Sequence, residues 1–302
     1  MENKEGKKMK TLSKVGLETG ELTDEELLFI DTAIVESARP ALRAREVFEI
    51  EPLPNAGLRT VRKYAETDMS QAFISMDGDT ITLDRTALSA TDVSVPVISK
   101  DFEVNWRDII ASRYGGMSLD VEMGRNAARQ VAEEENKLCM SGEYTGWRAL
   151  GIEGLATATN RNTEASAGAW PANTITDIND AIAELETDGF TSGPYVLIGR
   201  VDWIRKLDAA VANTTQTYKS FLLQNGILSA VYADDSLYAS DGGTDNAIVC
   251  VPGKENFSLK VGQDITTYRY PKETMNTLFR VFEVVTPVIK RPTSICEITG
   301  LT

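Results

Sequence analysis

The side chains that could do chemistry in this chain are carboxylates, because the sequence contains no histidine. Histidine is the commonest general acid/base and metal ligand, so its absence excludes a Ser-His-Asp triad, a Cys-His dyad and an HExxH zinc site. The 45 Asp and Glu residues leave hydrolysis by a carboxylate pair open, but so many acids also form pairs by chance. We therefore identify no catalytic residue and expect a protein that is not an enzyme.

Two other chemical patterns are equally uninformative. Cys139, Cys250 and Cys296 are an odd number of distant cysteines in a chain without a secretory signal, so we expect buried free thiols and no disulfide framework. The glycines of the segment Gly151–Gly154 are too closely spaced to bind phosphate and indicate a turn. We expect neither a metal ion nor a cofactor.

The composition is that of a globular chain with a sizeable core. Of its 302 residues, 42% are hydrophobic and 25% are charged, which is ordinary for folded domains. No window approaches the ~18–20 apolar residues of a membrane helix, and no apolar segment follows the basic N-terminus as in a secretory signal. We therefore expect no membrane partner and a cytoplasmic location, free or inside a particle made there.

The charge is acidic overall but uneven. A net charge of −14 disfavours nucleic acid as a partner for the whole surface. The first fourteen residues have a local balance of +5 − 2 = +3, because five lysines face Glu2 and Glu5 there. We interpret residues 1–21 as a basic arm, either a solubilising tail or an interior arm that touches an anionic partner such as packaged nucleic acid, an acidic neighbour or cargo. The lysines are Lys4, Lys7, Lys8, Lys10 and Lys14.

Two helices are expected to position the rest of the chain. Thr23 can cap the first, whose apolar stripe includes Leu27, Ile30 and Ile34. Ser118 precedes the best helical pattern, Leu119–Met140, which would be roughly 30 Å long and could serve as a spine. The apolar face of this helix is expected to hold Leu119, Met123, Ala127, Val131 and Leu138, with Arg129 and Glu133–Glu135 on the other faces.

The segment Gly57–Val95 is polar and alternates in places, with a turn at Met76–Asp79. These features predict a two-stranded ribbon with too few apolar residues to be stable alone in water. We therefore expect the ribbon to lie on a neighbouring subunit, which indicates obligate assembly.

From residue 151 onward, helices and strands alternate, which favours an α/β lobe. We expect a surface loop over Ala156–Asn173, helices over Ile178–Thr187 and Asp202–Val211, and strands over Tyr195–Ile198, Ile227–Ala239 and Ala247–Val251. At the end of the chain, Gly262–Asp264 predicts a turn before further β-rich runs. Their strand formers include Leu278, Val281, Val284, Val285, Val288 and Ile289.

Several segments follow the order found in encapsulin shell proteins, which share the HK97-like capsid fold of tailed-virus major capsid proteins. The most specific are Asp188-Gly189 with Gly193-Pro194-Tyr195, and the Gly262–Asp264 segment with its closing strands. The chain resembles this family over residues 22–302. The other matching positions are Ala44–Val47, Val95–Val97, Phe102, Trp106, Glu134-Glu135, Gly142, Gly151–Leu155 and Trp203.

The resemblance implies an α+β fold with five parts. Residues 1–21 would form the N-terminal arm, and residues 22–56 an N-terminal helix and strand. Residues 57–96 would form an extended loop, a β-ribbon that reaches across a neighbour. Residues 97–150 and 257–302 would form a peripheral domain with the long spine helix. Residues 151–256 would form an axial α/β domain around the five-fold axes and, in larger shells, the six-fold axes.

Three sites also follow from the resemblance. A terminal peptide of a cargo protein would lie in an apolar groove that includes Ile30 and Ile34, for which ordinary core packing is the alternative. Some members hold a flavin near the aromatic residue that corresponds to Trp106, but we expect Trp106 to be structural in this chain. The axial domain would line pores with an acidic ring that favours cations. The acids are Asp234, Asp235, Asp241 and Asp245.

Two shell functions stay open at this point, each with about 60 or more copies of the chain. An encapsulin would enclose a cargo protein, whereas a viral or prophage major capsid protein would package double-stranded DNA through a portal, in a virion. The basic arm, the long extended loop and the inserted segment Ala156–Asn173 depart from encapsulins and occur in viral capsid proteins too. A carboxylate-based hydrolase is a remote alternative, and the ribbon disfavours a monomeric binding module.

Overall fold

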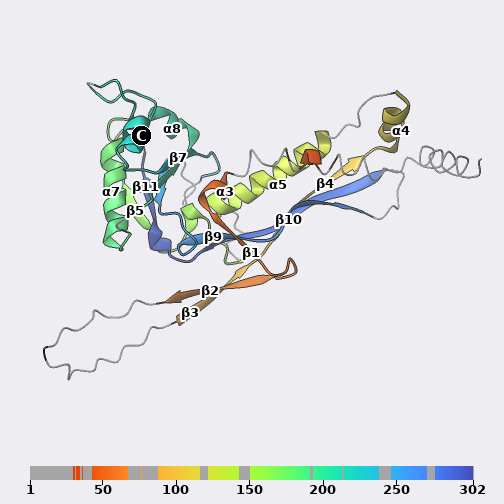
Figure 1. Ribbon diagram of the computed structural model, residues 1–302, viewed down its shortest axis with the longest axis horizontal. Helices are drawn as coiled ribbons and strands as arrows, with labels where there is room; N and C mark the ends of the chain where they lie inside the picture. The colour runs from red at the N-terminus through yellow and green to blue at the C-terminus, as the bar shows by residue number, and fades with distance from the viewer. Residues whose placement is uncertain are drawn as a thin grey trace, which may run out of the picture.

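The structure is a computed structural model that describes residues 30, 32–34, 36, 43–66, 76, 88–115, 122–142, 150–190, 193–212, 214–237, 246–270 and 276–301. These residues form a four-stranded sheet, a five-stranded sheet and a two-stranded ribbon (Figure 1). The five lysines of the basic arm lie outside the described residues, and so do Asp241, Asp245 and the segment 77–79 of the expected ribbon turn.

The four-stranded sheet has the strand order β1-β9-β10-β4. The edge strand β1 is parallel to β9, and β10 is antiparallel to both β9 and β4. Because one face of this sheet is rich in buried apolar side chains, it needs a cover. The strands are β1 (Glu49–Pro52), β4 (Val97–Val104), β9 (Phe257–Arg269) and β10 (Thr277–Ile289).

The long helix α5 (Glu122–Met140) supplies that cover and lies along the sheet in Figure 1. Its buried Leu138 belongs to the same apolar cluster as Val281 of β10. Gly124 allows a close approach, since a Cβ there would lie 3.3 Å from Ile34 Cδ1 and 3.3 Å from Phe102 Cζ. The predicted spine helix is confirmed from residue 122 to residue 140.

The five-stranded sheet has the order β5-β11-β8-β6-β7 and lies with its helices in a separate lobe (Figure 1). Its central strands β6 and β8 are buried along their whole length, which is typical of a sheet covered on both faces. The strands are β5 (Asn162–Ala165), β6 (Val196–Gly199), β7 (Ala230–Ala233), β8 (Asn246–Cys250) and β11 (Ile295–Thr299). The helices are α7 (Thr174–Thr187), α8 (Val201–Lys206) and α9 (Tyr218–Gln224).

Alternating residues of this sheet face two different cores. Cys250 of β8 lies in the core that also contains α5, whereas Cys296 of β11 lies in the core that contains α7. Cys139 of α5 is buried in the first core, and all three cysteines are free. The expectation of buried, unpaired thiols is confirmed.

The ribbon consists of β2 (Thr60–Glu66) and β3 (Leu88–Ser94), paired antiparallel along their whole length. It projects away from the two sheets (Figure 1). Two short helices complete the described elements near the four-stranded sheet: α3 (Ala44–Val47) before β1, and α4 (Trp106–Gly115) after β4. The predicted two-stranded ribbon is confirmed over these strands.

One prediction about the closing strands is wrong. The segment Gly262–Asp264 is not a turn but lies inside β9. The pairing of β10 with β9 shifts register on both sides of Val284, opposite this segment. A Cβ at Gly262 would lie 3.2 Å from Ala56 Cα and 3.3 Å from Val284 Cγ1. The glycine is therefore explained by a bulge and a close approach of two chain segments.

Other boundaries also differ from expectation. Ala156–Asn173 is not a surface loop throughout, because it contains β5 and the buried Trp170, whose Nε1 donates a hydrogen bond to Asp177 Oδ2 (2.7 Å). The closing strand β11 was expected in the peripheral domain, but it pairs with β5 and β8 of the other lobe. Helix α8 and strand β7 are shorter than predicted.

Candidate assembly surface and buried joint

The root of the ribbon is firmly attached to its own chain. Thr286 Oγ1 donates a hydrogen bond to Ser94 O (3.0 Å), and Ser94 N donates one to Leu150 O (3.3 Å). Lys63 Nζ donates to Ile289 O (3.2 Å) and makes an ion pair with Glu153 at the ribbon root. These bonds set the direction in which the ribbon leaves the body.

Apart from the side chains in these contacts and the buried Val93, the described side chains of the ribbon are largely exposed. Tyr64 is 55% exposed, although a tyrosine usually buries most of its ring. Arg62 and Asp92 pair across the two strands through Nε–Oδ1 (2.7 Å) and Nη2–Oδ2 (3.1 Å), and both are also exposed. The ribbon therefore presents an aromatic ring and a fixed pair of charges, the kind of surface found at protein–protein contacts.

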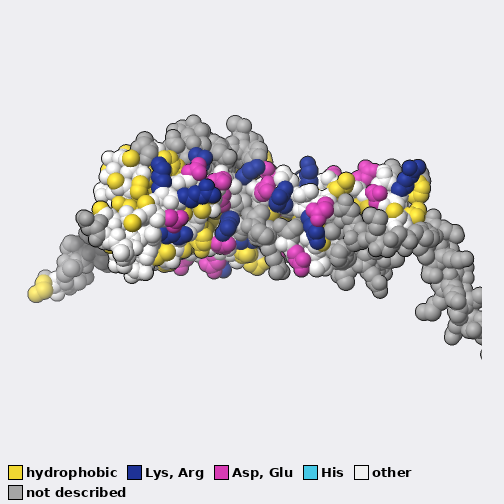
Figure 2. All heavy atoms as spheres, turned by 90° about the horizontal axis from the view of Figure 1, so that it is seen from above, with side chains coloured by type: hydrophobic (Ala, Val, Ile, Leu, Met, Phe, Trp, Pro, Cys, Tyr) yellow, Lys and Arg dark blue, Asp and Glu magenta, His cyan; other side chains and the backbone are white. Residues whose placement is uncertain are grey.

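Apolar side chains are also exposed on the four-stranded sheet and its helix. Val97 of β4, Tyr268 of β9 and Leu278 of β10 are exposed, and so is Met123 of α5 at 60%. The expectation that Met123 lies on the buried face of α5 is therefore wrong. The view in Figure 2 shows apolar side chains interleaved with charges of both signs along the molecule. Such a mixed surface is typical of non-obligate or rim contacts more than of a core.

A cluster of buried charges joins α3, α5 and the four-stranded sheet. The guanidinium of Arg45 donates two parallel hydrogen bonds to Glu135, Nε–Oε1 and Nη2–Oε2, both 2.8 Å. The same guanidinium donates to Asp264 Oδ1 (2.9 Å) and, more weakly, to Glu283 Oε2 (3.4 Å). Glu135 and Glu283 are both 0% exposed, whereas Asp264 is 68% exposed. We call these four residues the joint.

The joint holds more carboxylates than its one guanidinium can neutralise. Glu283 Oε1 is buried and accepts no hydrogen bond from the described residues. Burial, the charge of the neighbouring Glu135 carboxylate and a hydrogen bond between the two carboxyl groups raise the pKa of Glu283 to about 10. Burial, with Glu135 and Glu283 nearby, also raises the pKa of the Cys139 thiol well above its ordinary value. At neutral pH Glu283 is therefore a neutral acid and Cys139 a neutral thiol.

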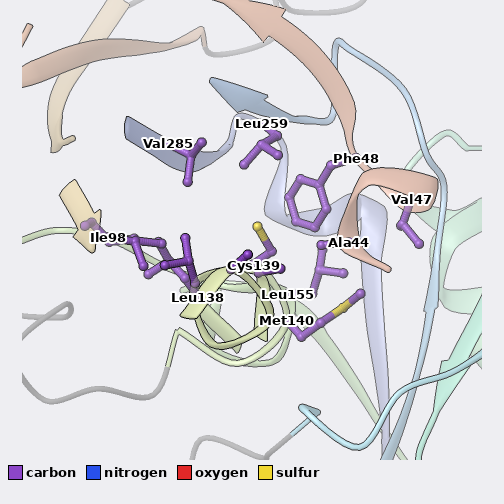
Figure 3. Packing of buried hydrophobic residues seen from close by; sticks show 14 of the residues in the cluster. Ala44, Val47, Phe48, Ile98, Leu138, Cys139, Met140, Leu155, Leu259 and Val285 are labelled. Carbon is purple, nitrogen blue, oxygen red and sulfur yellow. The ribbon is translucent and has the colours of Figure 1, made fainter. Parts of the chain in front are cut away.

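The next spine residue extends the joint to the other lobe. Asn136 Oδ1 accepts a hydrogen bond from Ala44 N (2.8 Å). Asn136 Nδ2 donates to Asp234 Oδ2 (2.6 Å) and to Ser236 Oγ (3.0 Å), in the loop after β7. Figure 3 shows Ala44 and Phe48 packed near Cys139 and Met140 at the end of α5. Polar and apolar contacts thus fasten α3 to the end of the spine helix.

The sequence reasoning missed the joint. Glu135 was placed on an exposed face of the spine, but it shares the buried face with Val131 and Leu138, at spacings of four and three residues. Glu283 lies two residues from both Val281 and Val285 and is buried with them on the core side of β10. Both signals, an acid at an apolar position of a helix or a strand, are present in the sequence.

A second buried arginine lies in the other lobe. Arg161 Nε donates to Glu297 Oε2 (2.7 Å), and its Nη2 donates to the same oxygen. Asn246 Nδ2 donates to the other oxygen, Glu297 Oε1. Arg161 Nη1 also donates to Ala158 O (3.2 Å). Within the described residues, one carboxylate therefore faces this guanidinium, and both of its oxygens accept hydrogen bonds.

The predicted site residues are not brought together. Ile30 and Ile34 are buried in the main apolar core, and Ile34 lies against Gly124 of α5. Asp234 is buried and bonded to Asn136, so within this chain it does not line an opening; Asp235 is exposed. Trp106, which begins α4, is half-buried, and the guanidinium of Arg107 lies 5.6 Å from its ring centroid.

Within the described residues, no group of three or more His, Cys, Asp or Glu side chains is placed to hold a metal ion. In the same residues, no helix is long and apolar enough to cross a membrane.

Comparisons with known sequences identify a family. The family model described as "Encapsulating protein for peroxidase" matches residues 15–286. A type 1 encapsulin shell protein of Myxococcus xanthus is 29% identical over 285 residues, which cover 92% of this chain and 94% of that protein. A diheme-cytochrome–encapsulin shell fusion protein of Kuenenia stuttgartiensis is 27% identical over 205 residues, 67% of this chain and 53% of the fusion.

Solved structures show the same fold at lower identity. A virus-like particle from Pyrococcus furiosus has a TM-score of 0.66 at 16% identity and covers 91% of this chain and 99% of its own. The capsid of Myoviridae phage XM1 has a TM-score of 0.64 at 14% identity, with coverages of 86% and 92%. These likenesses confirm the expected α+β, HK97-like capsid fold. Together with the sequence match over most of its length, they establish that the chain belongs to the encapsulin family of shell proteins.

Proposed function

We propose that copies of this chain assemble into a closed icosahedral shell that encloses a cargo protein. The observation that carries the proposal is the β2–β3 ribbon, whose root is bonded to its own chain and whose outer side chains are exposed. A two-stranded ribbon is marginal alone in water. The ribbon gains a partner when it lies across a neighbouring subunit, in a shell of about 60 or more copies.

Cargo is the proposed content of the shell, and DNA is the alternative. The relatives found by sequence are shell proteins named as encapsulins, whereas the capsid of phage XM1 resembles the chain in fold at 14% identity. A net charge of −14 also makes the chain a poor general partner for DNA. The proposed location is accordingly a cytoplasmic nanocompartment, and we assign the chain no catalytic role.

We propose that the terminal peptide of the cargo protein binds to the surface of the helical segment around Ile30 and Ile34. These two side chains are buried in the core, so they would support that surface from below and would not touch the cargo themselves. For the pores, we retain Asp235, Asp241 and Asp245 as lining residues and withdraw the buried Asp234. Replacing the three acids with Ser should change cation entry; unchanged entry would remove the pore assignment.

The first test is negative-stain electron microscopy of the native particle, with absorbance at 260 and 280 nm. Closed shells that contain protein and little nucleic acid support the proposal. Shells filled with DNA, or bearing tails, would make the chain a viral capsid protein. Small species alone under assembly conditions would overturn the shell function itself, and hydrolase activity of the purified particle would revive the remote alternative.

The second test addresses the ribbon. Tyr64→Ala removes an exposed ring that we place against the neighbour, so the concentration needed for assembly should rise by about tenfold or more. Tyr64→Phe is the matched control because it keeps the ring, and it should assemble as the wild type does. Light scattering during a dilution series measures the effect. Assembly of Tyr64→Ala at wild-type concentrations would contradict the role of the ribbon.

A further inference from the structure

We propose that the joint is a pH-sensitive latch. It holds helix α3 on the spine helix while Glu283 carries a proton, and it loosens when Glu283 ionises. This inference goes beyond shell formation and does not depend on it. A chain that failed to form shells would still show or lack the pH response, so the two sets of experiments are distinguishable.

The first argument is the count of charges in a buried place. One guanidinium faces three carboxyl groups, and two of these, Glu135 and Glu283, have no exposed surface. Glu135 takes the two short, parallel hydrogen bonds, and Glu283 is left with one contact of 3.4 Å from Arg45. Two buried carboxylates beside one cation cannot both ionise cheaply, so the weakly paired group keeps the proton.

The second argument is the orphaned oxygen. Glu283 Oε1 is buried and accepts no hydrogen bond from the described residues, and the hydrogen bond that the protonated Glu283 carboxyl makes with Glu135 would be lost on ionisation. A neutral carboxyl group tolerates one unpaired oxygen far better than a carboxylate does, because the desolvation penalty grows with charge. Ionisation of Glu283 would therefore place an uncompensated negative charge between α5 and the sheet.

Among the residues that the structure describes, no second cation lies beside Glu283 to compensate that charge. The charged and titratable groups that act on Glu283 are Arg45 from α3, Glu135 from α5 and Asp264 from β9; Cys139 on α5 adjoins the cluster, and Asp234, after β7, acts on Cys139. Of these, Arg45 is the cation, and it already serves Glu135. Asp264 is exposed and screened by solvent, so it opposes ionisation more weakly.

The position of the joint explains what would loosen. Arg45 lies in α3, and the preceding backbone amide, Ala44 N–H, is bonded to Asn136 beside Glu135. Once ionised, Glu283 repels Glu135 and competes with it for the guanidinium of Arg45. The hydrogen bonds between Arg45 and the spine helix are then weaker. Helix α3 is therefore the element that a change in pH would release, while α7 in the other lobe should not respond.

The test is amide hydrogen exchange over residues 43–52 in the wild type and Glu283→Gln, each between about pH 6 and about pH 10. Rates are compared between proteins at the same pH, which cancels the intrinsic base catalysis of exchange. We expect wild-type exchange to rise above that of the variant by up to about tenfold per pH unit. Equal ratios at every pH would overturn the latch.

Two variants guard against trivial outcomes. Glu297→Gln changes a buried glutamate of the other lobe and should leave the pH response of residues 43–52 intact. Asp264→Asn alters an exposed side chain and removes a negative neighbour, so Glu283 should ionise more readily and the rise should begin at lower pH. If the exchange rate of residues 43–52 in Asp264→Asn begins to rise at the same pH as in the wild type, the proposal is overturned. This test remains valid even if Glu283→Gln folds poorly.

Discussion

The two buried arginines of this chain have similar exposure but different surroundings. Arg45 is 15% exposed and Arg161 is 14% exposed, and each binds a glutamate that is almost wholly buried. Among the described residues, Arg161 faces one carboxylate, whose second oxygen accepts a hydrogen bond from Asn246. Arg45 faces Glu135, Glu283 and Asp264. The difference lies in the number of acids for each cation.

That difference separates a structural pair from a titratable cluster. A balanced, fully hydrogen-bonded pair keeps its charges over the working pH range and mainly fixes geometry. An unbalanced cluster holds an extra proton, and its stability depends on pH. In this chain the balanced pair lies in the lobe of the five-stranded sheet, whereas the unbalanced cluster lies where α3 meets the spine helix.

The largest effect is expected at the balanced pair. Arg161→Met would leave the carboxylate of Glu297 buried without its cation, which should lower the free energy of unfolding by about 3–5 kcal/mol. Denaturant unfolding at fixed protein concentration measures it, because assembly also contributes to stability. A loss below about 1 kcal/mol would mean that Asn246 and solvent are enough to stabilise the Glu297 carboxylate. The contrast between the two arginines would then not hold for Arg161.

The next effect concerns the strong acceptor of the joint. Glu135→Gln keeps the shape of the side chain but removes its charge and one of its two acceptor oxygens. We expect a loss of about 2–3 kcal/mol, smaller than for Arg161→Met, because Glu283 can ionise and replace the lost partner of Arg45. The same unfolding experiment measures this loss. Repeated across pH, it should also show a lowered pKa of Glu283 in the variant. An unchanged pH dependence of stability would contradict the idea that Glu283 replaces Glu135 as the partner of Arg45.

The third prediction is a pH dependence with a defined sign. Glu283 has a pKa of about 10 in the folded chain against an ordinary value of 4.5, so the folded state holds the extra proton between these values. Its contribution to stability is complete below about pH 4.5 and is lost as the pH rises to about 10. The unfolding midpoint of the wild type should fall over this range. Glu283→Gln should flatten that fall, so the variant should match the wild type near about pH 4.5 and become the more stable of the two as the pH rises.

The smallest effect is expected next to the joint. Arg43 pairs with Glu46 at 3.8 Å, and both side chains are about half exposed. Arg43→Met should therefore change the free energy of unfolding by less than about 1 kcal/mol. This variant is the matched control for Arg45→Met, which removes a buried cation two residues later. Equal losses in the two variants would show that burial of the guanidinium does not set the energy.

Local patterns predicted many elements of the fold. The spine helix has the 3.6-residue period of an amphipathic helix, and the closing strands are rich in β-branched residues. Length, composition and these periods also indicated that no window spans a membrane and that a ribbon with few apolar residues exists. Such features depend on neighbours in sequence, which is why a single chain sufficed to find them.

Boundaries and pairings were harder to predict. Gly262 was interpreted as part of a turn because glycine commonly marks one, but its role is to let β9 pass close to Ala56 and Val284. Strand β11 was assigned with its neighbours in sequence, whereas it completes the sheet of the other lobe. Both errors come from contacts between residues far apart in the chain.

Composition and local patterns are enough to exclude histidine-dependent catalytic sites, to predict many of the elements and, through the resemblance to encapsulins, to indicate the family. The burial of Asp234, and the guanidinium that Glu135 and Glu283 share, are visible in the folded chain alone. The physical reason is that the state of a carboxyl group depends on burial and on partners brought in by folding, from as far as 238 residues away in the case of Arg45 and Glu283.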